Sequence, residues 1–313
     1  MTSTVPRQSA LPEQPDPVDD SQADRPPCVL VFNASDPSGA GGLAADIGAI
    51  ASVGAHALPI VTGAYTRDTA EIIDHHAFDD EAVREQARTV LEDIAAEVIK
   101  VGFVGSIENI SAIAEIAADY ADIPLIAYMP DLSWWSEVQI DLYLDAFRDL
   151  MLPQTTVLVG NHSTLCRWLL PDWKAAKSPG PRDVARAAHA FGVAYTLVTG
   201  IAQPEQRIDN VLASPQSVLV SGQFDRLGAG FSGAGDTLTG ALAALLATES
   251  DLGDAVREAL SYLDRCLESG FRPGMGHLVP DRLFWAQPEP DSDDNSGDSA
   301  DLRIDFPDHD TKH

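Results

Sequence analysis

The chain has 313 residues, of which 45% are hydrophobic and 7% aromatic, enough for one large α/β domain or two smaller ones with a real core. Its 48 Asp and Glu outnumber its 20 Lys and Arg, giving a formal net charge of −28. Such a surface repels phosphate backbones, so we expect no nucleic-acid partner, and no apolar run approaches the roughly 20 residues of a membrane span.

Elements predicted from the apolar pattern alternate between buried strands and amphipathic helices. Strands are expected at 28–34, 58–65, 97–104, 124–129, 155–160 and 194–200. Helices are expected between them, at 42–53, 80–96, 107–120, 138–150 and 181–191. A late antiparallel hairpin at one sheet edge (207–213 and 216–222) and two helices (234–247 and 252–269) follow. Near-continuous apolar strands that alternate with helices predict an α/β fold with a mainly parallel sheet covered on both faces.

The two ends of the chain differ in composition from this body. Residues 1–27 are rich in Pro, Asp, Gln and Ser, and residues 287–313 are a segment of the same kind. Because neither segment can bury enough apolar surface to offset the entropy of ordering, both are predicted to be disordered tails. One folded domain is therefore expected over 28–286.

Cysteine usage and the N-terminus bear on location. Cys28, Cys166 and Cys266 lie far apart, without a C-x-x-C pair. This sparse, odd number argues against a disulfide framework and against a zinc site. The N-terminus lacks the apolar stretch of a signal peptide. These features predict a cytoplasmic protein.

The stretch FSGAGDTLTGALAALLA, residues 231–247, joins small residues, a carboxylate and an apolar helix. Apolar side chains recur at helical spacing after Asp236, which places Gly233, Ala234 and Gly235 at the helix N-terminus. Backbone amides there can hold an anion, and the carboxylate can accept a proton from a nearby hydroxyl. This arrangement suits phosphoryl transfer to an alcohol. The alternative is that Asp236 is an ordinary first-turn acid and the glycines form a turn.

A second glycine-rich stretch, NASDPSGAGGLAADIGAIASVGA at 33–55, runs from the first strand into the first helix. It contains neither G-K-[ST] nor the spacing of a dinucleotide fingerprint. A loop at the carboxyl end of a strand is nonetheless where α/β proteins bind ligands. Asp46, inside the following helix, is therefore either a solvated surface acid or a carboxylate that accepts hydrogen bonds from a ligand.

These stretches resemble the hydroxymethylpyrimidine/phosphomethylpyrimidine kinases of the ribokinase-like superfamily. ASDPSGAGGLAADIGAIASVGAHALPIVTGAYTRDT is similar to the family's A-G-x-D-P-S-G-G-A-G-I-Q-A-D block with its following A-x-G-A and Q-N-T, and FSGAGDTLTGALAALLA to its H-G-T-G-C-T-L-S-A-A-L-A block. IKVGFVGS (99–106) resembles K-I-G-M-L, and RPGMGHL (272–278) resembles G-x-G-x-G-P. The correspondence runs from about Val29 to Trp285 and implies a ribokinase-like three-layer sandwich.

The resemblance implies ATP-dependent phosphorylation of 4-amino-5-hydroxymethyl-2-methylpyrimidine and of its monophosphate, in thiamine biosynthesis. ATP and Mg²⁺ are the implied cofactors, the small pyrimidine is the partner, and a homodimer is expected. Asp236 takes the role of the base, and Gly233, Ala234 and Gly235 form the anion hole. The family has Cys at the position of Asp236, whereas Asp is the usual base in the wider ribokinase-like and pyridoxal-kinase groups.

Substrate contacts are implied at four positions. Asp46 takes the place of the carboxylate that hydrogen-bonds the aminopyrimidine, and Ala34 lies beside the ring through its backbone. Phe103 stands where the family has a pocket Met. Arg67 stands where Gln or Glu precedes N-T.

Nucleotide contacts are implied at Asn161, Thr199 and Gly200. Tyr128 and Thr164 stand where the family has an acid and a glutamate that organise magnesium, and Thr199 stands where it has a lysine. Asp131 is the candidate that could reach the metal through water. These departures leave two alternatives open: a pyridoxal-type or other small-alcohol kinase, and a non-catalytic pyrimidine-binding protein.

Overall fold

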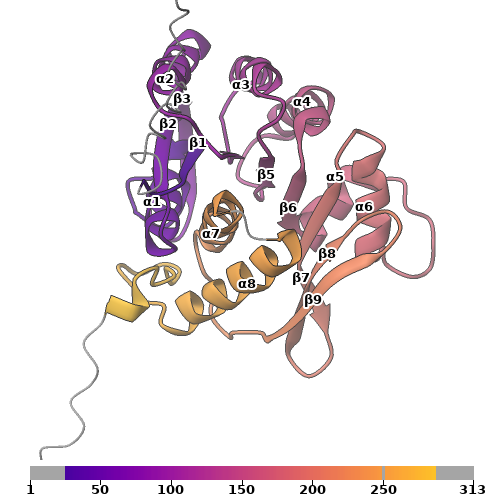
Figure 1. Ribbon diagram of the computed structural model, residues 1–313. Helices are drawn as coiled ribbons and strands as arrows, with labels where there is room; N and C mark the ends of the chain where they lie inside the picture. The colour runs from indigo at the N-terminus through magenta and orange to yellow at the C-terminus, as the bar shows by residue number, and fades with distance from the viewer. Residues whose placement is uncertain (1–24, 249–250, 287–313) are drawn as a thin grey trace, which may run out of the picture.

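A computed structural model describes residues 25–248 and 251–286; nearly all of both predicted tails lies outside the described residues. Within this part of the chain, nine strands form one sheet. Across the sheet they are β3 (Ile72–Ala77), β2 (His56–Arg67), β1 (Cys28–Ser35), β4 (Val98–Val101), β5 (Leu125–Met129), β6 (Val157–Asn161), β7 (Tyr195–Gln203), β8 (Arg207–Ala213) and β9 (Val218–Asp225). The central strands β2, β1, β4, β5, β6 and β7 are parallel to one another. At the two edges, β3 pairs antiparallel with β2, and β8 and β9 follow β7 in antiparallel pairing (Figure 1).

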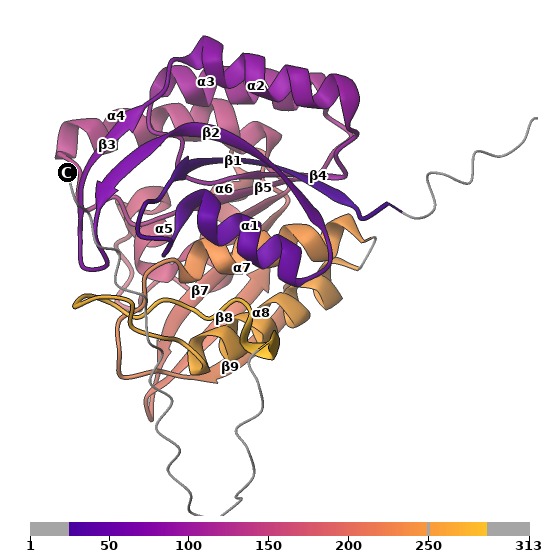
Figure 2. The same ribbon diagram turned by 90° about the vertical axis from the view of Figure 1, so that its left-hand side faces the viewer.

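Helices cover both faces of this sheet, and Figure 2 shows strands β2, β1 and β4 between α2 and α3 on one side and α1 and α7 on the other. One face carries α2 (Asp80–Asp93), α3 (Ile107–Asp119), α4 (Glu137–Ala146), α5 (His162–Leu169) and α6 (Pro181–His189). The other carries α1 (Gly42–Ser52), α7 (Ala234–Ala247) and α8 (Leu252–Glu268). A π-helical turn (Phe147–Met151) and a 3-10 turn (Leu152–Gln154) continue α4, and a 3-10 turn (Phe284–Ala286) follows α8. The predicted α/β sandwich with its mainly parallel sheet is confirmed.

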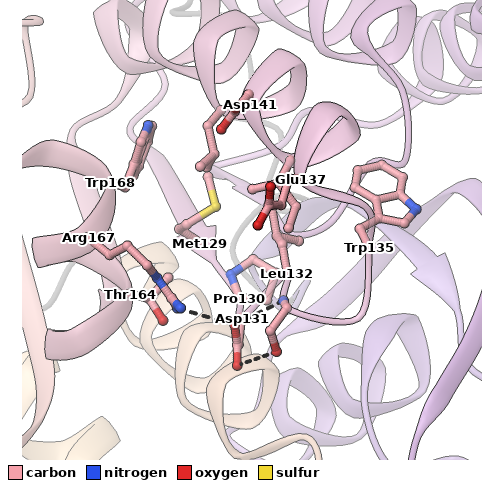
Figure 3. Close-up of a pocket in the computed structure, with 13 residues that line it drawn as sticks. Met129, Pro130, Asp131, Leu132, Trp135, Glu137, Asp141, Thr164, Arg167 and Trp168 are labelled. Atoms are coloured by element: carbon pink, nitrogen blue, oxygen red, sulfur yellow. Dashed lines mark hydrogen bonds and ion pairs between the residues drawn. The ribbon is translucent and has the colours of Figure 1, made fainter. Parts of the chain in front are cut away.

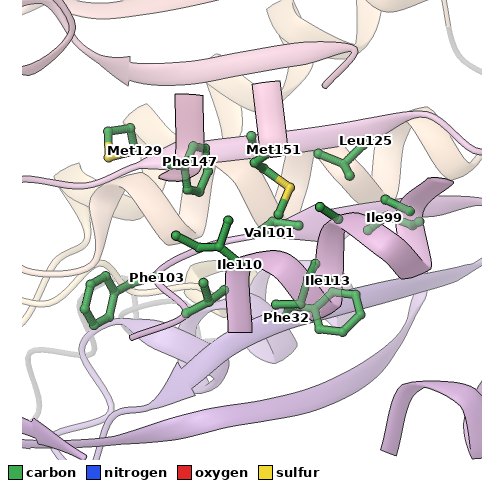
Figure 4. Close-up of a cluster of buried hydrophobic side chains, with 14 of the residues drawn as sticks. Phe32, Ile99, Val101, Phe103, Ile110, Ile113, Leu125, Met129, Phe147 and Met151 are labelled. Carbon is green, nitrogen blue, oxygen red and sulfur yellow. The ribbon is translucent and has the colours of Figure 1, made fainter. Parts of the chain in front are cut away.

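Strand alternation divides the core between the two faces. In β1, Leu30 and Phe32 pack under α2 and α3, whereas Val29 and Val31 pack under α1 and α7. Figure 4 shows the first of these clusters, in which Phe32 lies near Ile99 and Val101 of β4. Because both faces are covered, each central strand is apolar on both sides, which is why the strands read as continuous apolar runs.

Two elements differ from the predicted set. β3 has the polar sequence IIDHHA and lies at the sheet edge, where its side chains are mostly exposed, so it lacks the apolar run used to recognise strands. α5 has only eight residues and follows β6 directly, with Asn161 as its N-cap. Short or polar elements of this kind are stabilised by their neighbours, and their own pattern is weak.

Two predictions from composition concern covalent links and membranes. Cys28, Cys166 and Cys266 carry free thiols, and the first and last are buried. In the described part of the chain, no helix combines the length and the apolar character needed to cross a bilayer.

Candidate active site

A group of polar side chains lies in the otherwise apolar layer between the sheet and helices α1 and α7. Asn33 on β1 and Lys100 on β4 share this face because they alternate in phase with Val31 and Val98. The helices supply Asp46 from α1 and Asp236 from the first turn of α7. Burial is complete for Asn33, Asp46 and Lys100, each 0% exposed.

These side chains form one hydrogen-bonded network around the ammonium group of Lys100. Its Nζ lies 2.7 Å from Oδ1 of Asp46 and 3.0 Å from Oδ1 of Asp236. Asn33 Nδ2 donates to Oδ2 of Asp46 at 2.7 Å and to Oδ1 of Asp236 at 2.9 Å. The amide of Gly42 donates to Oδ2 of Asp236 at 3.0 Å. Asp236, whose side chain is 16% exposed, is the carboxylate of this group that faces outward.

Burial and charge act in opposite directions on the titration of this network. Burial raises the pKa of Asp46 to about 6; Lys100 opposes the rise and Asp236 adds to it. For Lys100, burial acts to lower the pKa of the ammonium group, but the two carboxylates outweigh it and the net shift is upward. The lysine is therefore charged, and it compensates two acids.

The start of α7 contacts the glycine loop 36–42 so closely that small residues are required. Gly233 has φ +84°, and a Cβ there would overlap the carbonyl oxygen of Ala40. Arg282 joins the same two segments, because its guanidinium donates to the carbonyl oxygens of Gly39 and Ala40 and to Oγ1 of Thr237. The amides at this helix start therefore lie in a narrow, fixed place beside Asp236.

Arg67, at the end of β2, reaches the same region. Its guanidinium lies 3.3 Å from Oδ2 of Asp36, whose side chain is 0% exposed, and donates to Oγ of Ser232 at 3.1 Å. Asp36 in turn accepts from the amide of Gly41 at 2.8 Å. A Cβ on Gly41 would lie 3.1 Å from Oδ2 of Asp236, so the two carboxylates approach each other across this glycine. The structure thus places Arg67 beside the predicted catalytic group.

Phe103 and Ala34 are both buried. Phe103 is 2% exposed, and Ala34 is 0% exposed. The Phe103 ring packs in an aromatic cluster with Tyr65, His75, Trp134, Trp135 and Tyr143, with centroid distances between 4.9 and 5.7 Å. An apolar, aromatic wall therefore stands where the sequence predicts contacts to a substrate ring.

His75 is the polar member of this aromatic cluster. Its imidazole lies against the backbone at Gly63 and Gly105, where an added Cβ would meet the ring. Within the described structure, neither ring nitrogen has a hydrogen-bond partner. Burial lowers the pKa of His75 to about 4 from its usual 6.5, with His76 adding to the shift.

This depressed pKa predicts an acid-sensitive region. The unfolded chain takes up a proton on His75 near pH 6.5 and the folded chain near pH 4, so this contribution to stability is lost between those values as pH falls. We expect urea midpoints of the His75→Phe variant to fall less steeply over that range than those of the wild type. The His76→Phe variant, whose native side chain is 71% exposed, removes only the smaller of the two contributions that lower the His75 pKa, so its slope should stay closer to that of the wild type than to that of His75→Phe. Parallel slopes for wild type and His75→Phe would contradict the assignment.

A cavity of about 240 Å³ brings together the residues predicted to bind nucleotide. Asn161 at the end of β6, and Thr199 and Gly200 in β7, line it together with Ala234 and Gly235 of α7. Most of the remaining wall is apolar, with Phe224, Phe231, Leu238, Leu260, Leu263 and Leu267 among its residues, and the charged residues Asp225, Arg226 and Asp264 also line it. An apolar cavity that opens onto the amides of a helix start suits a ligand with a flat base and an anionic end.

Asp131 lies apart from that cavity. It lines a second cavity of about 460 Å³ together with Thr164 and Arg167, shown in Figure 3. Its carboxylate lies 3.5 Å from the Arg167 guanidinium and accepts from the amide and hydroxyl of Ser133. In the described residues, no group of three or more His, Cys, Asp or Glu could hold a metal ion.

Tyr128 lies on the face of β5 that is covered by α7, whereas the cavity that Asp131 lines lies on the other face. A Cβ on Gly235 would overlap the Tyr128 hydroxyl, and the tyrosine ring centroid lies 5.8 Å from Nζ of Lys100. Burial raises the pKa of Tyr128, and Asp236 adds to the rise, so this phenol is neutral. A neutral hydroxyl therefore stands beside the helix start, at the position where an acid was expected.

Four residues of this site were not identified from the sequence: Asn33, Asp36, Lys100 and Arg282. Lys100 did carry a signal, because a lysine in the phase of Val98 within a buried strand must find a counter-ion. Asn33 likewise lies near the end of a buried strand, on the same face. Asp36 and Arg282 lie in loops, where no periodicity indicates which way a side chain points.

Known proteins resemble this chain in sequence. The sequence profile of the phosphomethylpyrimidine kinase family matches residues 36–281. A hydroxymethylpyrimidine/phosphomethylpyrimidine kinase of Mycobacterium tuberculosis is 30% identical over 274 residues, covering 83% of this chain and 94% of the relative. The enzyme of the same name from Streptomyces coelicolor is 27% identical over 263 residues, covering 83% of this chain and 96% of the relative.

Solved structures show the same fold. An ADP complex of Bacillus subtilis pyridoxal kinase superimposes with a TM-score of 0.74 at 18% identity, covering 83% of this chain and 98% of the kinase. A phosphomethylpyrimidine kinase from Clostridium difficile superimposes with a TM-score of 0.63 at 19% identity, covering 76% of this chain and 97% of that structure. The fold is thus the ribokinase-like sandwich that the sequence predicted. The chain belongs to the phosphomethylpyrimidine kinase family.

Proposed function

We propose that this protein phosphorylates 4-amino-5-hydroxymethyl-2-methylpyrimidine and its monophosphate with ATP, in thiamine biosynthesis. The observation that carries the proposal is the position of Asp236, at the start of α7, where the cavity lined by Asn161, Thr199 and Gly200 meets the helix amides. Family relatives support the choice of acceptor, and a relative from Arabidopsis thaliana is named a thiamine biosynthetic bifunctional enzyme.

The site supplies the groups that the reaction needs. The base of the nucleotide would occupy the apolar cavity, and its phosphates would reach the amides of Gly233, Ala234 and Gly235. The acceptor hydroxyl attacks the γ-phosphorus as the bond to the β-phosphate oxygen breaks, and its proton passes to Asp236. Oδ2 of Asp236 is the suitable oxygen, because it accepts from Gly42 alone, whereas Oδ1 accepts from both Asn33 and Lys100.

Magnesium is proposed only as a companion of the nucleotide. The described residues do not fit a metal bound by several protein ligands, because Tyr128 and Thr164 are neutral side chains and Asp131 is paired with Arg167. Kinase magnesium ions commonly keep several waters and bind through the phosphates, so such an ion would arrive on ATP. Arg67, which is paired with Asp36 beside Gly41, would contribute positive charge near Asp236.

A pyridoxal-type kinase is the second candidate. The aromatic cluster around Phe103 and the ion pair of Arg67 with Asp36 favour it, because the resemblance implies a Met at the first position and a Gln or Glu at the second in a pyrimidine pocket. Both candidates use Asp236 and the same nucleotide cavity, so they differ in the acceptor alone.

A substrate panel tests the proposal. The purified chain is incubated with ATP and magnesium and with the hydroxymethylpyrimidine, its monophosphate or pyridoxal, and ADP release is measured. Highest kcat/KM for the two pyrimidines is the expected result, and preference for pyridoxal would favour the second candidate. Pyrimidine binding by calorimetry without any turnover would indicate a non-catalytic binding protein. Light scattering on the same sample tests the proposed homodimer.

A further inference from the structure

We propose that Lys100 is the positioning residue of the catalytic carboxylate: it holds Asp236 ionised and oriented, and Asp46 is its buried counter-ion and not a substrate ligand. This inference rests on the proposed function, since it assigns Asp236 as the base. It concerns two residues whose side chains have no exposed surface and therefore cannot touch a ligand in this arrangement.

Charge balance requires such a role. Lys100 is 0% exposed in a layer of Val, Leu and Ala side chains, and an isolated ammonium there would be very costly. Asp46 neutralises it at 2.7 Å from within α1. Asp236 accepts from the same ammonium at 3.0 Å, so the lysine also stabilises the charged form of the outward-facing carboxylate.

Asn33 makes the geometry directional. Its amide nitrogen donates to both carboxylates, and its own oxygen accepts from the amide of Ala34 at 2.9 Å, which fixes the orientation of the side chain. Oδ1 of Asp236 is thus engaged from two strands, and Oδ2 is turned toward Gly42 and the open side. A rigidly oriented carboxylate is what proton transfer at short range needs.

Other charged and titratable groups surround Asp236, and they cannot replace Lys100. From the elements packed against it these are Asp46 of α1, Lys100 of β4, Tyr128 of β5, Tyr65 and Arg67 of β2, Asp36 of the glycine loop and Arg282 of the C-terminal segment. Arg67 is paired with Asp36, and Arg282 donates to backbone carbonyls and Thr237. Lys100 is the cation in direct contact with the carboxylate of Asp236 in the described structure.

Two variants have opposite expected effects. Lys100→Met removes the ammonium, so the charged form of Asp236 is less favoured: the acidic limb of the kcat/KM profile should move up by about one pH unit or more, and kcat should fall about 10²-fold. Asp46→Asn keeps the shape of the side chain but removes one of the two carboxylates that contact the Lys100 ammonium. Asp236 is then its only charged partner among these residues, so the acidic limb of the kcat/KM profile should keep its wild-type position or move to lower pH. KM for the acceptor should be unchanged in Asp46→Asn.

A ligand role for Asp46 gives a different result. If Asp46 contacts the aminopyrimidine, Asp46→Asn raises KM for the acceptor and leaves the acidic limb in place, which overturns the proposal. Because Lys100→Met leaves two facing carboxylates and can fail to fold, Lys100→Met/Asp46→Asn removes one charge of each sign and provides the second measurement. The acidic limb of its kcat/KM profile should still lie at a higher pH than that of Asp46→Asn. If the two variants have their acidic limbs at the same pH, the role of Lys100 is overturned.

The test does not depend on turnover. Carbon-13 NMR titration of the aspartate carboxyl groups, with the Asp236 resonance assigned through Asp236→Asn, reads the same coupling in an inactive protein. The titration midpoint of Asp236 is compared between Asp46→Asn and Lys100→Met/Asp46→Asn. A difference between the two midpoints supports the pairing even if the substrate panel shows no kinase activity. An unmoved midpoint overturns it, even if the protein is an active kinase.

Discussion

Replacing Asp236 by Asn is expected to lower kcat by about 10²–10⁴-fold, the usual range for loss of a general base. An amide cannot accept the proton of the acceptor hydroxyl, although it nearly matches the shape of the carboxylate. Nucleotide affinity should change little, because the cavity lined by Asn161, Thr199 and Gly200 is untouched. Steady-state kinetics with the best acceptor of the panel, and calorimetry with ADP, measure the two effects.

The control for this prediction is another Asp→Asn change on a helix. Asp119, at the end of α3, has a side chain that is 64% exposed and an ion pair with Arg88 at 3.7 Å, so Asp119→Asn should leave kcat unaltered. A wild-type kcat for Asp236→Asn would move the base elsewhere. The next candidate is then Asp36, which approaches Asp236 across Gly41.

The helix that carries Asp236 was predictable because its sequence determines it locally. Apolar residues at helical spacing follow a glycine that must adopt φ +84°, and the structure starts α7 at Ala234 as expected. In the same way, the alternation of apolar strands with helices was sufficient to predict the mainly parallel sheet, and the late hairpin was recognised as the antiparallel edge formed by β8 and β9. Each of these inferences uses neighbours in the sequence and needs no knowledge of distant contacts.

The partners of Asp236 were not predictable in the same way. Lys100, Asn33 and Asp46 come from three elements, and their contact depends on the sheet order that sets β1 beside β4 under α1 and α7. Asp46 illustrates the limit, since a helix acid in the sequence is compatible with solvent, with a ligand or with a buried lysine. The structure shows it wholly buried, 2.7 Å from the ammonium of Lys100.

Aromatic packing around Phe103 exceeded what the sequence could indicate. Tyr65, His75 and Phe103 are separated by up to 38 residues in the sequence, and they meet because β3 folds back on β2. The edge strand β3 was not predicted, because its sequence is polar. Trp134 and Trp135 join them from the loop before α4. The surroundings of Phe103 therefore depend on contacts that only the folded chain creates.

Gly233→Ala is expected to damage both stability and catalysis. A residue with a Cβ costs about 1–2 kcal/mol in the left-handed region where Gly233 lies, at φ +84°. Its methyl group would also overlap the carbonyl oxygen of Ala40 and lie 2.9 Å from the Arg282 guanidinium, so the glycine loop and the start of α7 must separate. If these amides hold the phosphates as proposed, their displacement by about 1 Å is sufficient to lower kcat about 10²-fold.

Gly228→Ala provides the matched control, five residues earlier in the same segment. A Cβ on Gly228 meets nothing within 4 Å, and this glycine is not among those with positive φ in the described structure. Thermal unfolding and kcat of Gly228→Ala should therefore equal those of the wild type. If Gly233→Ala behaved like Gly228→Ala, the loop and α7 would tolerate separation and the helix amides could not be the fixed anion site. If Gly233→Ala lost stability but kept its kcat, the close contact of Gly233 with Ala40 would serve the fold alone, and Asp236 would act without it.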